Sequence, residues 1–477
     1  MIPLPSLYPD QYEVIEKVRA AFGAGHKTVI LQSPTGSGKS RMGAYIATGA
    51  INKGSTVLFD VPMKELRKQI GNSFYSLGID HSYIAAGNRF NPFSRCWIST
   101  TPTIANRLDR TPRINFALID EGHQGGEGRD KLKRWLRAQG AKILILTATP
   151  ERLDGKPVDE ECDCLVMGKE VRWLIDNKRL SEYRLFAPSQ PDLSKLRTTA
   201  TGEYRDSDVS SFMESQNVII GDMVKHYKEL AFGKRNIAYC ASVKHSQMVC
   251  QAFKDAGIPS AHIDGTMSDG ERTAIVKAFA RREIWNITNA DLLLYGWDLA
   301  AASGDDNAVV ESISDAKPTM SKSGQKQKDG RGLRYKPEPL VLMSHAGNHF
   351  GSDGQAKHGL PCTPVDWNWK GREKGTAEGK EKTIPCRQCP VCFFVMRPTP
   401  ACVSCGHVFE VKSRVLETVE GELVEVTREQ LQGIQKDERK VQGQAKTLPE
   451  LIELGRRKGV KNPAFWARKI MEGRKRA

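Results

Sequence analysis

The chain has 477 residues, of which 39% are hydrophobic and 27% are charged, a composition typical of folded globular proteins and not of disordered or fibrous ones. Its length suggests about three domains. No uninterrupted apolar run is long enough to span a membrane, and the N-terminus has neither a basic region nor a long apolar core, so we expect a soluble, cytoplasmic protein. The net charge of +15 favours a polyanionic partner, although a generally basic surface would give the same value.

The first motif with chemical content is a glycine-rich turn near the N-terminus. It reads Ser33-Pro34-Thr35-Gly36-Ser37-Gly38-Lys39-Ser40, and it lies between an apolar run and an expected helix. This arrangement predicts a P-loop, whose backbone N–H groups and helix N-terminus face the phosphates of a nucleotide. Lys39 would reach the β- and γ-phosphates, and the Ser40 hydroxyl would bind Mg²⁺. Ser33 stands where the common pattern has glycine.

An acidic pair follows a second apolar strand. Phe116–Ile119 leads into Asp120-Glu121-Gly122-His123. The carboxyl end of a parallel strand is where P-loop folds hold a metal ion and position the attacking water. We expect Asp120 to bind Mg²⁺ and Glu121 to orient and deprotonate water. A third buried strand then leads into Thr147-Ala148-Thr149-Pro150.

These three motifs, in this order, resemble motifs I, II and III of superfamily 2 helicases of the DEAD/DEAH group, and in particular the phage and prophage set that is similar to RadD-like helicases. Leu7–Gln11 resembles the motif whose glutamine reads adenine, which implies a nucleotide contact for Gln11. Val57–Leu66 and Ile98–Thr103 resemble motifs Ia and Ib, which grip the nucleic-acid backbone in this family.

The resemblance also implies roles for single residues. The ATP-contacting set that it implies is Gln11, Thr35, Gly36, Ser37, Gly38, Lys39, Ser40, Gly296 and Asp298. The catalytic set is Lys39, Asp120, Glu121, His123, Arg331 and Arg334. The nucleic-acid contacts are Pro62, Lys64, Thr101, Thr103, Gly265 and Thr288.

The chain beyond Pro150 predicts a second parallel sheet. Strand patterns at 236–240 and 260–266 alternate with helix patterns at 245–253 and 271–279, a β-α-β-α rhythm. Tyr183–Pro188 reads as the crossing between the two lobes.

Two further motifs of the resemblance lie in this half. Thr288–Asp298 resembles motif V, which implies that Thr288 touches a phosphate and Asp298 senses ATP. Gln327–Arg334 resembles motif VI, whose arginines would stabilise charge on the γ-phosphate from the opposing lobe. Arg331 and Arg334 would share one face of a helical turn. The segment Leu299–Lys328 is longer and more polar than the family pattern, so the helix that presents Arg331 is expected to be short or mobile.

Five of the eleven cysteines cluster near the C-terminal third. Cys389, Cys392, Cys402 and Cys405 form two Cys-x-x-Cys knuckles, which predict a tetrahedral Zn²⁺ site. Cys386 is a competing ligand. A purely structural zinc ribbon and a nucleic-acid contact are both open. Because every motor motif precedes residue 382, we expect the ribbon to be dispensable for basal ATP hydrolysis.

The remaining C-terminal chain reads as a linker at 370–382, a hairpin at 412–426, a polar segment at 429–446 and two helices that begin near Leu448 and Pro463. Thr447 suits the cap of the first helix. Basic residues and Trp466 make this tail a candidate for phosphate-backbone binding, and a solvated helix pair with a core tryptophan is the alternative.

The sequence therefore predicts an α/β fold with two tandem RecA-like parallel-sheet domains, a small zinc ribbon and a helical C-terminal tail. The expected domains are 1–185, 186–369, 370–412 and 413–477.

The expected function is an ATP-dependent DNA helicase or translocase that uses ATP, Mg²⁺ and Zn²⁺. DNA, whether single-stranded, duplex or forked, is favoured over RNA, with replication, recombination or repair proteins as possible partners and no membrane. The alternatives are the motor of a restriction-type or annealing complex without strand separation, and a zinc-ribbon binding protein that uses ATP as a conformational switch.

Overall fold

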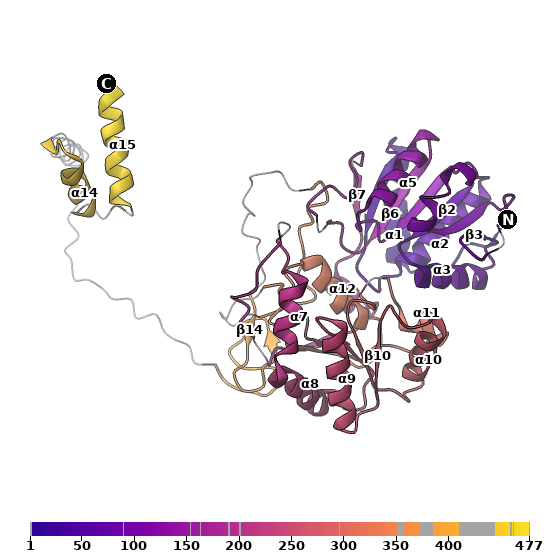
Figure 1. The fold of residues 1–477 in the computed structure, drawn as a ribbon. Coiled ribbons are helices and arrows are strands. Elements are labelled where there is room, and N and C mark those ends of the chain that lie inside the picture. The colour runs from indigo at the N-terminus through magenta and orange to yellow at the C-terminus, as the bar shows by residue number, and fades with distance from the viewer. Residues whose placement is uncertain are drawn as a thin grey trace. The chain divides into compact units, whose positions relative to one another are not determined.

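The computed structural model describes residues 2–88, 90–152, 154–162, 164–188, 191–199, 202–294, 296–350, 357–371, 385–409, 444–457, 460 and 462–476. The expected hairpin at 412–426, most of the linker at 370–382 and most of the segment at 429–446 lie outside these residues. The chain divides into two units, Met1–Phe409 and Glu410–Ala477 (Figure 1).

The first lobe is built on a seven-stranded sheet with the order β3-β4-β2-β5-β6-β1-β7, in which neighbouring strands run parallel. Helices cover both faces, so the central strands are continuously apolar, as expected for a parallel sheet buried on both sides. The strands are β1 (Thr28–Gln32), β2 (Val57–Val61), β3 (Ser82–Ile84), β4 (Cys96–Thr100), β5 (Phe116–Asp120), β6 (Lys142–Thr147) and β7 (Cys164–Met167).

Alternate side chains of each central strand enter two separate cores. In β1, Val29 and Leu31 face one core and Ile30 faces the other, and all three are fully buried. This two-sided packing fixes the register of the strands, and so it fixes where their carboxyl ends place the P-loop and Asp120.

The second lobe is a six-stranded parallel sheet with the order β10-β11-β9-β12-β13-β8. Its strands are β8 (Tyr183–Phe186), β9 (Asn236–Tyr239), β10 (Ser260–Ile263), β11 (Asn286–Asn289), β12 (Ser312–Asp315) and β13 (Leu340–Ser344). The expected crossing at Tyr183–Pro188 is wrong, because β8 already pairs with β13 as the edge strand of this sheet. The second sheet therefore begins before the expected boundary at 185/186.

Helices connect the strands of both lobes (Figure 1). The first lobe contains α1 (Pro9–Gly23), α2 (Lys39–Asn52), α3 (Lys64–Ser76), α4 (Thr101–Ile104), the 3-10 turn η1 (Leu108–Arg110) and α5 (Glu127–Ala138). Helix α6 (Val171–Asp176) precedes β8 and packs into the core of the second lobe through Leu174 and Ile175. The second contains α7 (Asp206–Glu214), α8 (Asn217–Leu230), α9 (Val243–Asp255), α10 (Asp269–Ala280), α11 (Leu299–Ser303) and α12 (Lys322–Gly332). None of the helices in the described part of the chain combines the length and apolar character needed to cross a membrane.

Two short strands, β14 (Arg387–Gln388) and β15 (Val395–Met396), pair antiparallel and carry the cysteine knuckles. The second unit holds α14 (Leu448–Arg457) and α15 (Pro463–Arg476). Thr447 caps α14, since its hydroxyl accepts from the Glu450 N–H at 3.5 Å and the Glu450 carboxylate accepts from the Thr447 N–H at 3.2 Å, which forms a capping box. Phe465 on α15 is exposed, with Lys469 above its ring.

Candidate active site

The P-loop has the conformation that its sequence predicts. Gly36 and Gly38 have φ angles of 82° and 87°, a left-handed region that glycine occupies without strain. A Cβ at position 38 would lie 2.4 Å from Gln11 Nε2, so the loop also needs glycine for space. Helix α2 begins at Lys39, and its N-terminus faces the loop, which suits phosphate binding.

Side-chain contacts hold this loop closed. The Ser33 hydroxyl donates to the Ser37 hydroxyl at 2.7 Å, so the residue that replaces the usual glycine braces the turn. Gln11 Nε2 donates to the Ser37 carbonyl at 2.9 Å, and Gln11 Oε1 accepts from the Tyr8 N–H. Lys39 Nζ donates to the carbonyls of Ser33 and Pro34. The glutamine therefore links the N-terminal segment to the P-loop.

The acidic pair lies at the carboxyl end of β5. In the sheet, a single strand, β6, separates β5 from β1, the strand that leads into the P-loop. Asp120 and Glu121 are 5% and 4% exposed. Burial and the Glu121 charge raise the pKa of Asp120 to about 7, with Lys39 opposing them. Burial also acts to raise the pKa of Glu121, but the surrounding His123, Lys39 and Arg331 outweigh it and lower that pKa. Glu121 is therefore the carboxylate held ionised, as a base requires.

His123 joins the acidic motif to the Thr-Ala-Thr motif. Its Nδ1 lies 2.9 Å from the Thr147 hydroxyl and 3.5 Å from Glu121 Oε2. Burial lowers the pKa of His123 to about 4, so the imidazole is neutral at pH 7. The intervening Gly122 has no room for a side chain, because a Cβ there would stand 2.3 Å from Ile145 Cγ2.

The second lobe reaches this site through α12. Gln327 Nε2 lies 3.4 Å from Glu121 Oε2 and 3.3 Å from Thr149 Oγ1. A Cβ at Gly330 would lie 2.4 Å from Thr35 Cβ, so the helix backbone rests against the P-loop. The polar segment before α12 has not moved this helix out of the cleft, and α12 is 11 residues long rather than short.

Arg331 is held at the end of α12 by three acceptors. Its Nε donates to Leu294 O at 3.0 Å, its Nη1 to Trp297 O at 2.6 Å, and its Nη2 to Gln327 Oε1 at 3.1 Å. Two of these acceptors belong to the motif V loop, so the position of the guanidinium depends on that loop.

Arg334 lies beyond the end of α12, which differs from the expectation that it shares a helical turn with Arg331. Its Nη1 donates to Asp298 Oδ1 at 2.7 Å, and the same oxygen caps α11 by accepting from Ala301 N. Gly296, the other expected nucleotide contact of motif V, has a φ of 64°.

A buried polar cradle explains why so polar a helix packs inside the second lobe. Lys328 Nζ donates to Asp315 Oδ1 at 2.8 Å, and His349 Nε2 lies 3.2 Å from Asp329 Oδ1. Lys326 Nζ donates to three backbone carbonyls between Leu360 and Thr363. The sequence motifs did not reveal this cradle, because its partners come from the end of β12 and from the chain after β13, outside the motifs.

The expected nucleic-acid residues divide into two groups. Lys64 and Gly265 are exposed, and Pro62 and Thr103 are half-buried, all just after the carboxyl ends of strands. Thr101 and Thr288 are buried, and their hydroxyls are used inside the lobes. Thr288 Oγ1 donates to Ser246 O at 2.9 Å, and Thr101 Oγ1 donates to Asp60. A phosphate contact by either hydroxyl is therefore not supported.

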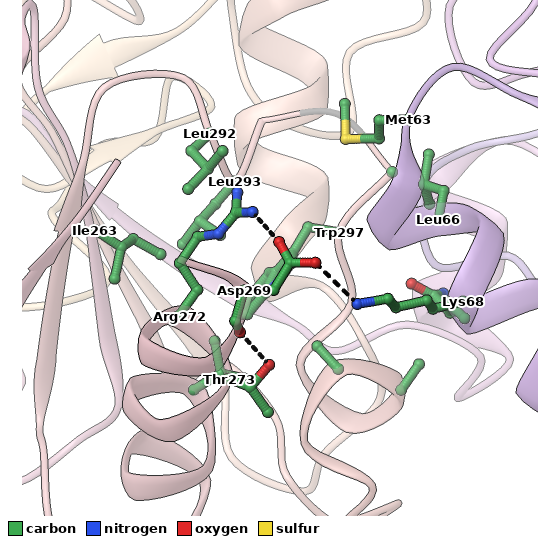
Figure 2. Close-up of a pocket in the computed structure, with 15 residues that line it drawn as sticks. Met63, Leu66, Lys68, Ile263, Asp269, Arg272, Thr273, Leu292, Leu293 and Trp297 are labelled. Atoms are coloured by element: carbon green, nitrogen blue, oxygen red, sulfur yellow. Dashed lines mark hydrogen bonds and ion pairs between the residues drawn. The ribbon is translucent and has the colours of Figure 1, made fainter. Parts of the chain in front are cut away.

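The two lobes also meet beside motifs Ia and V, around an apolar cavity of about 130 Å³ (Figure 2). A Cβ at Gly296 would lie 2.2 Å from Leu66 Cδ1. At the rim, Asp269 accepts from Lys68 of the first lobe at 3.1 Å and from Arg272 at 2.6 Å. The motif V loop thus lies between α3 and the arginine of motif VI.

The four expected zinc ligands converge. The sulfur atoms of Cys389, Cys392, Cys402 and Cys405 all lie within 4.8 Å of one another, and two of the Sγ–Sγ distances are 3.6 Å. A tetrahedral Zn²⁺ with bonds of about 2.3 Å needs sulfur atoms about 3.8 Å apart, so the set fits zinc. Cys386 lies outside this group and packs against the second lobe.

The ribbon is docked on the second lobe rather than independent of it. Phe394 bridges to Phe186 of β8, and their ring centroids are 5.4 Å apart. Ala187 N donates to Phe393 O at 3.1 Å, and Gln388 Nε2 donates to Ala187 O at 2.5 Å. The ribbon therefore covers the edge strand of the sheet, and its removal would expose β8.

Comparisons with known proteins agree with this architecture. Residues 4–152 match the family described as type III restriction enzyme, res subunit. A 51.5 kDa protein of a Lactococcus phage (isolate 7-9) is 30% identical over 387 residues, which cover 81% of this chain and 79% of that protein. The putative ATP-dependent helicase IRC3 of Saccharomyces cerevisiae is 24% identical over 62% of this chain, which spans about half the length (47%) of that relative.

Among solved structures, the ATP-dependent Type ISP restriction-modification enzyme LlaBIII bound to DNA shares the fold, with a TM-score of 0.51 and 14% identity over 72% of this chain and 28% of that one. The order of the motifs, the two parallel sheets and the identity with the phage protein agree. The chain belongs to the same family as the phage 51.5 kDa protein, and it has the motif order and the two-lobed fold of superfamily 2 helicases.

Proposed function

We propose that this protein is an ATP-dependent DNA translocase or helicase that hydrolyses ATP between its two lobes. The observation that carries the proposal is the contact of Gln327 and Gly330 in the second lobe with Glu121 and Thr35 in the first. It gathers the P-loop, the acidic pair and Arg331 around one cleft, which is the set that phosphoryl transfer to water requires.

Each group has a distinct part in this reaction. The backbone N–H groups of the P-loop and Lys39 bind the phosphates, and Ser40 and Asp120 would hold Mg²⁺, which neutralises phosphate charge when bound. Glu121 takes the proton of the attacking water. Arg331 stabilises charge that develops on the γ-phosphate. Arg334 donates to Asp298 of the motif V loop and so couples the position of that loop to ATP hydrolysis.

We assign the lobes to residues 1–170 and 171–369, because α6 packs into the core of the second lobe and β8 belongs to the second sheet. Zn²⁺ held by four thiolates with no open position is structural rather than catalytic. The helix pair of the second unit is assigned to binding the phosphate backbone, since Arg456, Arg457, Arg468 and Lys469 are exposed there beside Phe465.

The preference for DNA rests on the motif resemblance and on the phage relative, and it points to phage or bacterial DNA replication, recombination or repair. The match to the res subunit of type III restriction enzymes favours a second candidate, translocation on duplex DNA without strand separation. ATP used only as a conformational switch would give slow turnover that nucleic acid leaves unchanged.

The deciding experiment compares ATP turnover with single-stranded, duplex and forked DNA and with RNA. Stimulation by DNA but not by RNA is the expected result. A strand-displacement assay on forked DNA and a triplex-displacement assay on duplex DNA then separate unwinding from translocation. Turnover that no nucleic acid stimulates would contradict the motor assignment.

A further inference from the structure

A continuous chain of buried hydrogen bonds runs from β2 to the acidic motif. Asp60, in β2, is fully buried. Its Oδ1 accepts from the Ser99 hydroxyl at 2.7 Å, and its Oδ2 accepts from the Thr101 hydroxyl at 2.5 Å. Thr101 is the first residue of α4, directly after the carboxyl end of β4. Asp60 therefore holds the start of α4, in the segment Ile98–Thr103 that is expected to bind the nucleic-acid backbone.

Arg129 extends this chain to Glu121. It lies in α5 and is 3% exposed. Its Nη2 donates to Thr101 Oγ1 at 3.0 Å, and its Nη1 donates to the backbone carbonyl of Glu121 at 2.6 Å. One guanidinium thus joins the segment after β4 to the segment after β5. We call Asp60, Thr101 and Arg129 the buried relay.

The hydrogen bonds of the buried relay cannot be replaced easily, because its charged groups are buried. An arginine without a partner in the protein interior is strongly destabilising. Burial raises the pKa of Asp60 to about 6, while the Arg129 charge and the two hydroxyl donors oppose that rise. The planar fork of arginine reaches two acceptors at once, a geometry that lysine does not reproduce.

The contact at Glu121 acts on a sensitive position of the backbone. Glu121 has a φ of 46°, in the left-handed region where a side chain is strained and the surrounding structure must hold it. Arg129 donates to the carbonyl of this residue. A small displacement of Arg129 therefore changes the direction of the Glu121 side chain, which lies 3.4 Å from Gln327 of the other lobe.

The other end of the relay lies next to exposed residues. Pro102 is exposed and Thr103 is half-buried. Helix α4 packs closely on α5, since a Cβ at Gly128 would lie 3.3 Å from Ala105 Cβ. A ligand that shifts the first turn of α4 therefore moves both the hydroxyl of Thr101 and the helix that carries Arg129.

We propose that Arg129 is a positioning residue that transmits nucleic-acid binding at Pro102 and Thr103 to the carboxylate of Glu121. The inference rests on the proposed function, because it names the route by which DNA stimulates turnover. Nucleic acid bound at α4 displaces Thr101, and Thr101 displaces the Arg129 guanidinium to which it is hydrogen-bonded. The guanidinium then changes the backbone conformation of Glu121 through its hydrogen bond to the Glu121 carbonyl. The alternative is that the three residues only stabilise the first lobe.

The test compares Thr101→Val, Arg129→Lys and Arg129→Met in the full-length protein. Thr101→Val keeps the shape and removes the hydroxyl that joins Asp60 to Arg129. Each variant is measured for basal turnover, for turnover with a saturating single-stranded DNA oligonucleotide of mixed sequence, for the KM of ATP and for Tm. Coupling between two sites ordinarily amounts to about 5- to 150-fold, so we expect the ratio of stimulated to basal turnover to fall by a factor in that range.

The KM of ATP should change little, and Arg129→Lys should regain part of the ratio because it restores one of the two donors. The double variant Thr101→Val, Arg129→Met should lose no more stimulation than Arg129→Met alone, since both lie on one route. If Arg129→Met does not fold, Thr101→Val still decides the question.

A purely structural role would lower Tm and both rates together and leave the ratio unchanged. A ratio equal to that of the parent in Thr101→Val and Arg129→Met would overturn the relay. A parent protein with no stimulation by DNA would instead overturn the proposed function, and the relay with it, so the two failures are distinct.

Discussion

Gly330 of the second lobe and Thr35 of the P-loop approach so closely that a Cβ on the glycine would lie 2.4 Å from Thr35 Cβ. This contact sets how far the lobes close, because α12 carries Arg331 one residue further on. The position of the arginine relative to the phosphates therefore depends on a residue that has no side chain.

Gly330→Ala should lower turnover by tenfold or more. Overpacking at a tight contact costs about 1–3 kcal/mol, and the cleft relieves it by opening, which withdraws Arg331. ATP binding to the P-loop of the first lobe should be retained. The measurements are kcat and the affinity for a fluorescent ATP analogue.

Gly324→Ala is the matched control, since it lies in the same helix and its Cβ would meet its nearest neighbour at an ordinary 3.4 Å. Equal turnover in Gly330→Ala and Gly324→Ala would show that the Gly330 contact does not limit closure.

Glu121→Gln should abolish turnover and retain ATP binding, because the shape is kept while the charge that takes the proton of water is lost. Glu127→Gln, an exposed carboxylate at the start of α5, is the control and should hydrolyse ATP like the parent. Lys39→Ala should weaken nucleotide binding as well. Near-parent turnover in Glu121→Gln would remove this residue from the reaction.

Arg331→Ala should reduce turnover by about 10³-fold, the usual effect of losing an arginine that contacts the transferred phosphoryl group. Arg331→Lys should recover little, because one ammonium cannot satisfy Leu294 O, Trp297 O and Gln327 Oε1 together. Single-turnover rates at saturating ATP measure the effect on chemistry. If both variants keep the parent rate, the charge on the γ-phosphate is stabilised by another residue.

Stability should fall as the pH drops from about 6.5 to about 4. Burial lowers the pKa of His123, His245 and His358 to about 4 and that of His345 to about 3. The unfolded chain therefore binds more protons than the folded one in this window, at up to about 1.4 kcal/mol per pH unit for each histidine. The contribution of these neutral histidines to the free energy of unfolding is complete above about pH 6.5 and is lost as the pH falls toward 4.

The buried acids Asp60 and Asp120 act in the opposite direction, since burial raises their pKa to about 6 and about 7. The four histidines outweigh the two acids, so we expect the protein to lose stability on acidification. Measurement of Tm between pH 7.5 and 4.5 tests this expectation. His345→Asn should flatten that dependence. A Tm that does not fall over this range would show that these histidines titrate normally.

The sequence predicted the elements whose chemistry is local. The P-loop turn, the acidic pair after β5 and the two knuckles are each encoded within a few consecutive residues, so spacing alone located them. The buried relay was missed, because Asp60, Thr101 and Arg129 meet only when β2, β4 and α5 pack together. No local pattern distinguishes Arg129 from Lys131 and Arg134, which are exposed in the same helix.

The same limit applies to the second lobe. The polar run before Arg331 does not predict a packed helix, because its partners are supplied by other elements. Asp315 at the end of β12 accepts from Lys328, and backbone carbonyls between Leu360 and Thr363 accept from Lys326. An edge strand of four residues carries a weak pattern, so the sequence predicts a crossing at Tyr183–Pro188 where the structure has β8.

Removing zinc should destabilise the motor itself, because the ribbon covers β8. Four thiolates that lose their metal cannot hold two knuckles together, and the Ala187 N–H and carbonyl then lose their partners at Phe393 and Gln388. Cys389→Ser should lose the metal, lower Tm and reduce basal turnover. Cys386→Ser, outside the cysteine group, should keep the metal and serves as the control. Metal analysis, thermal unfolding and ATP turnover give the three readouts.

Phe394→Ala separates metal binding from docking. It leaves all four thiolates in place and removes the ring that lies 5.4 Å from Phe186, so zinc should remain while Tm falls by several degrees. A protein truncated after residue 384 should behave like Cys389→Ser in Tm and turnover. If the truncated protein instead keeps the parent Tm and basal turnover, β8 is stable without its cover, and the ribbon serves only to contact other molecules.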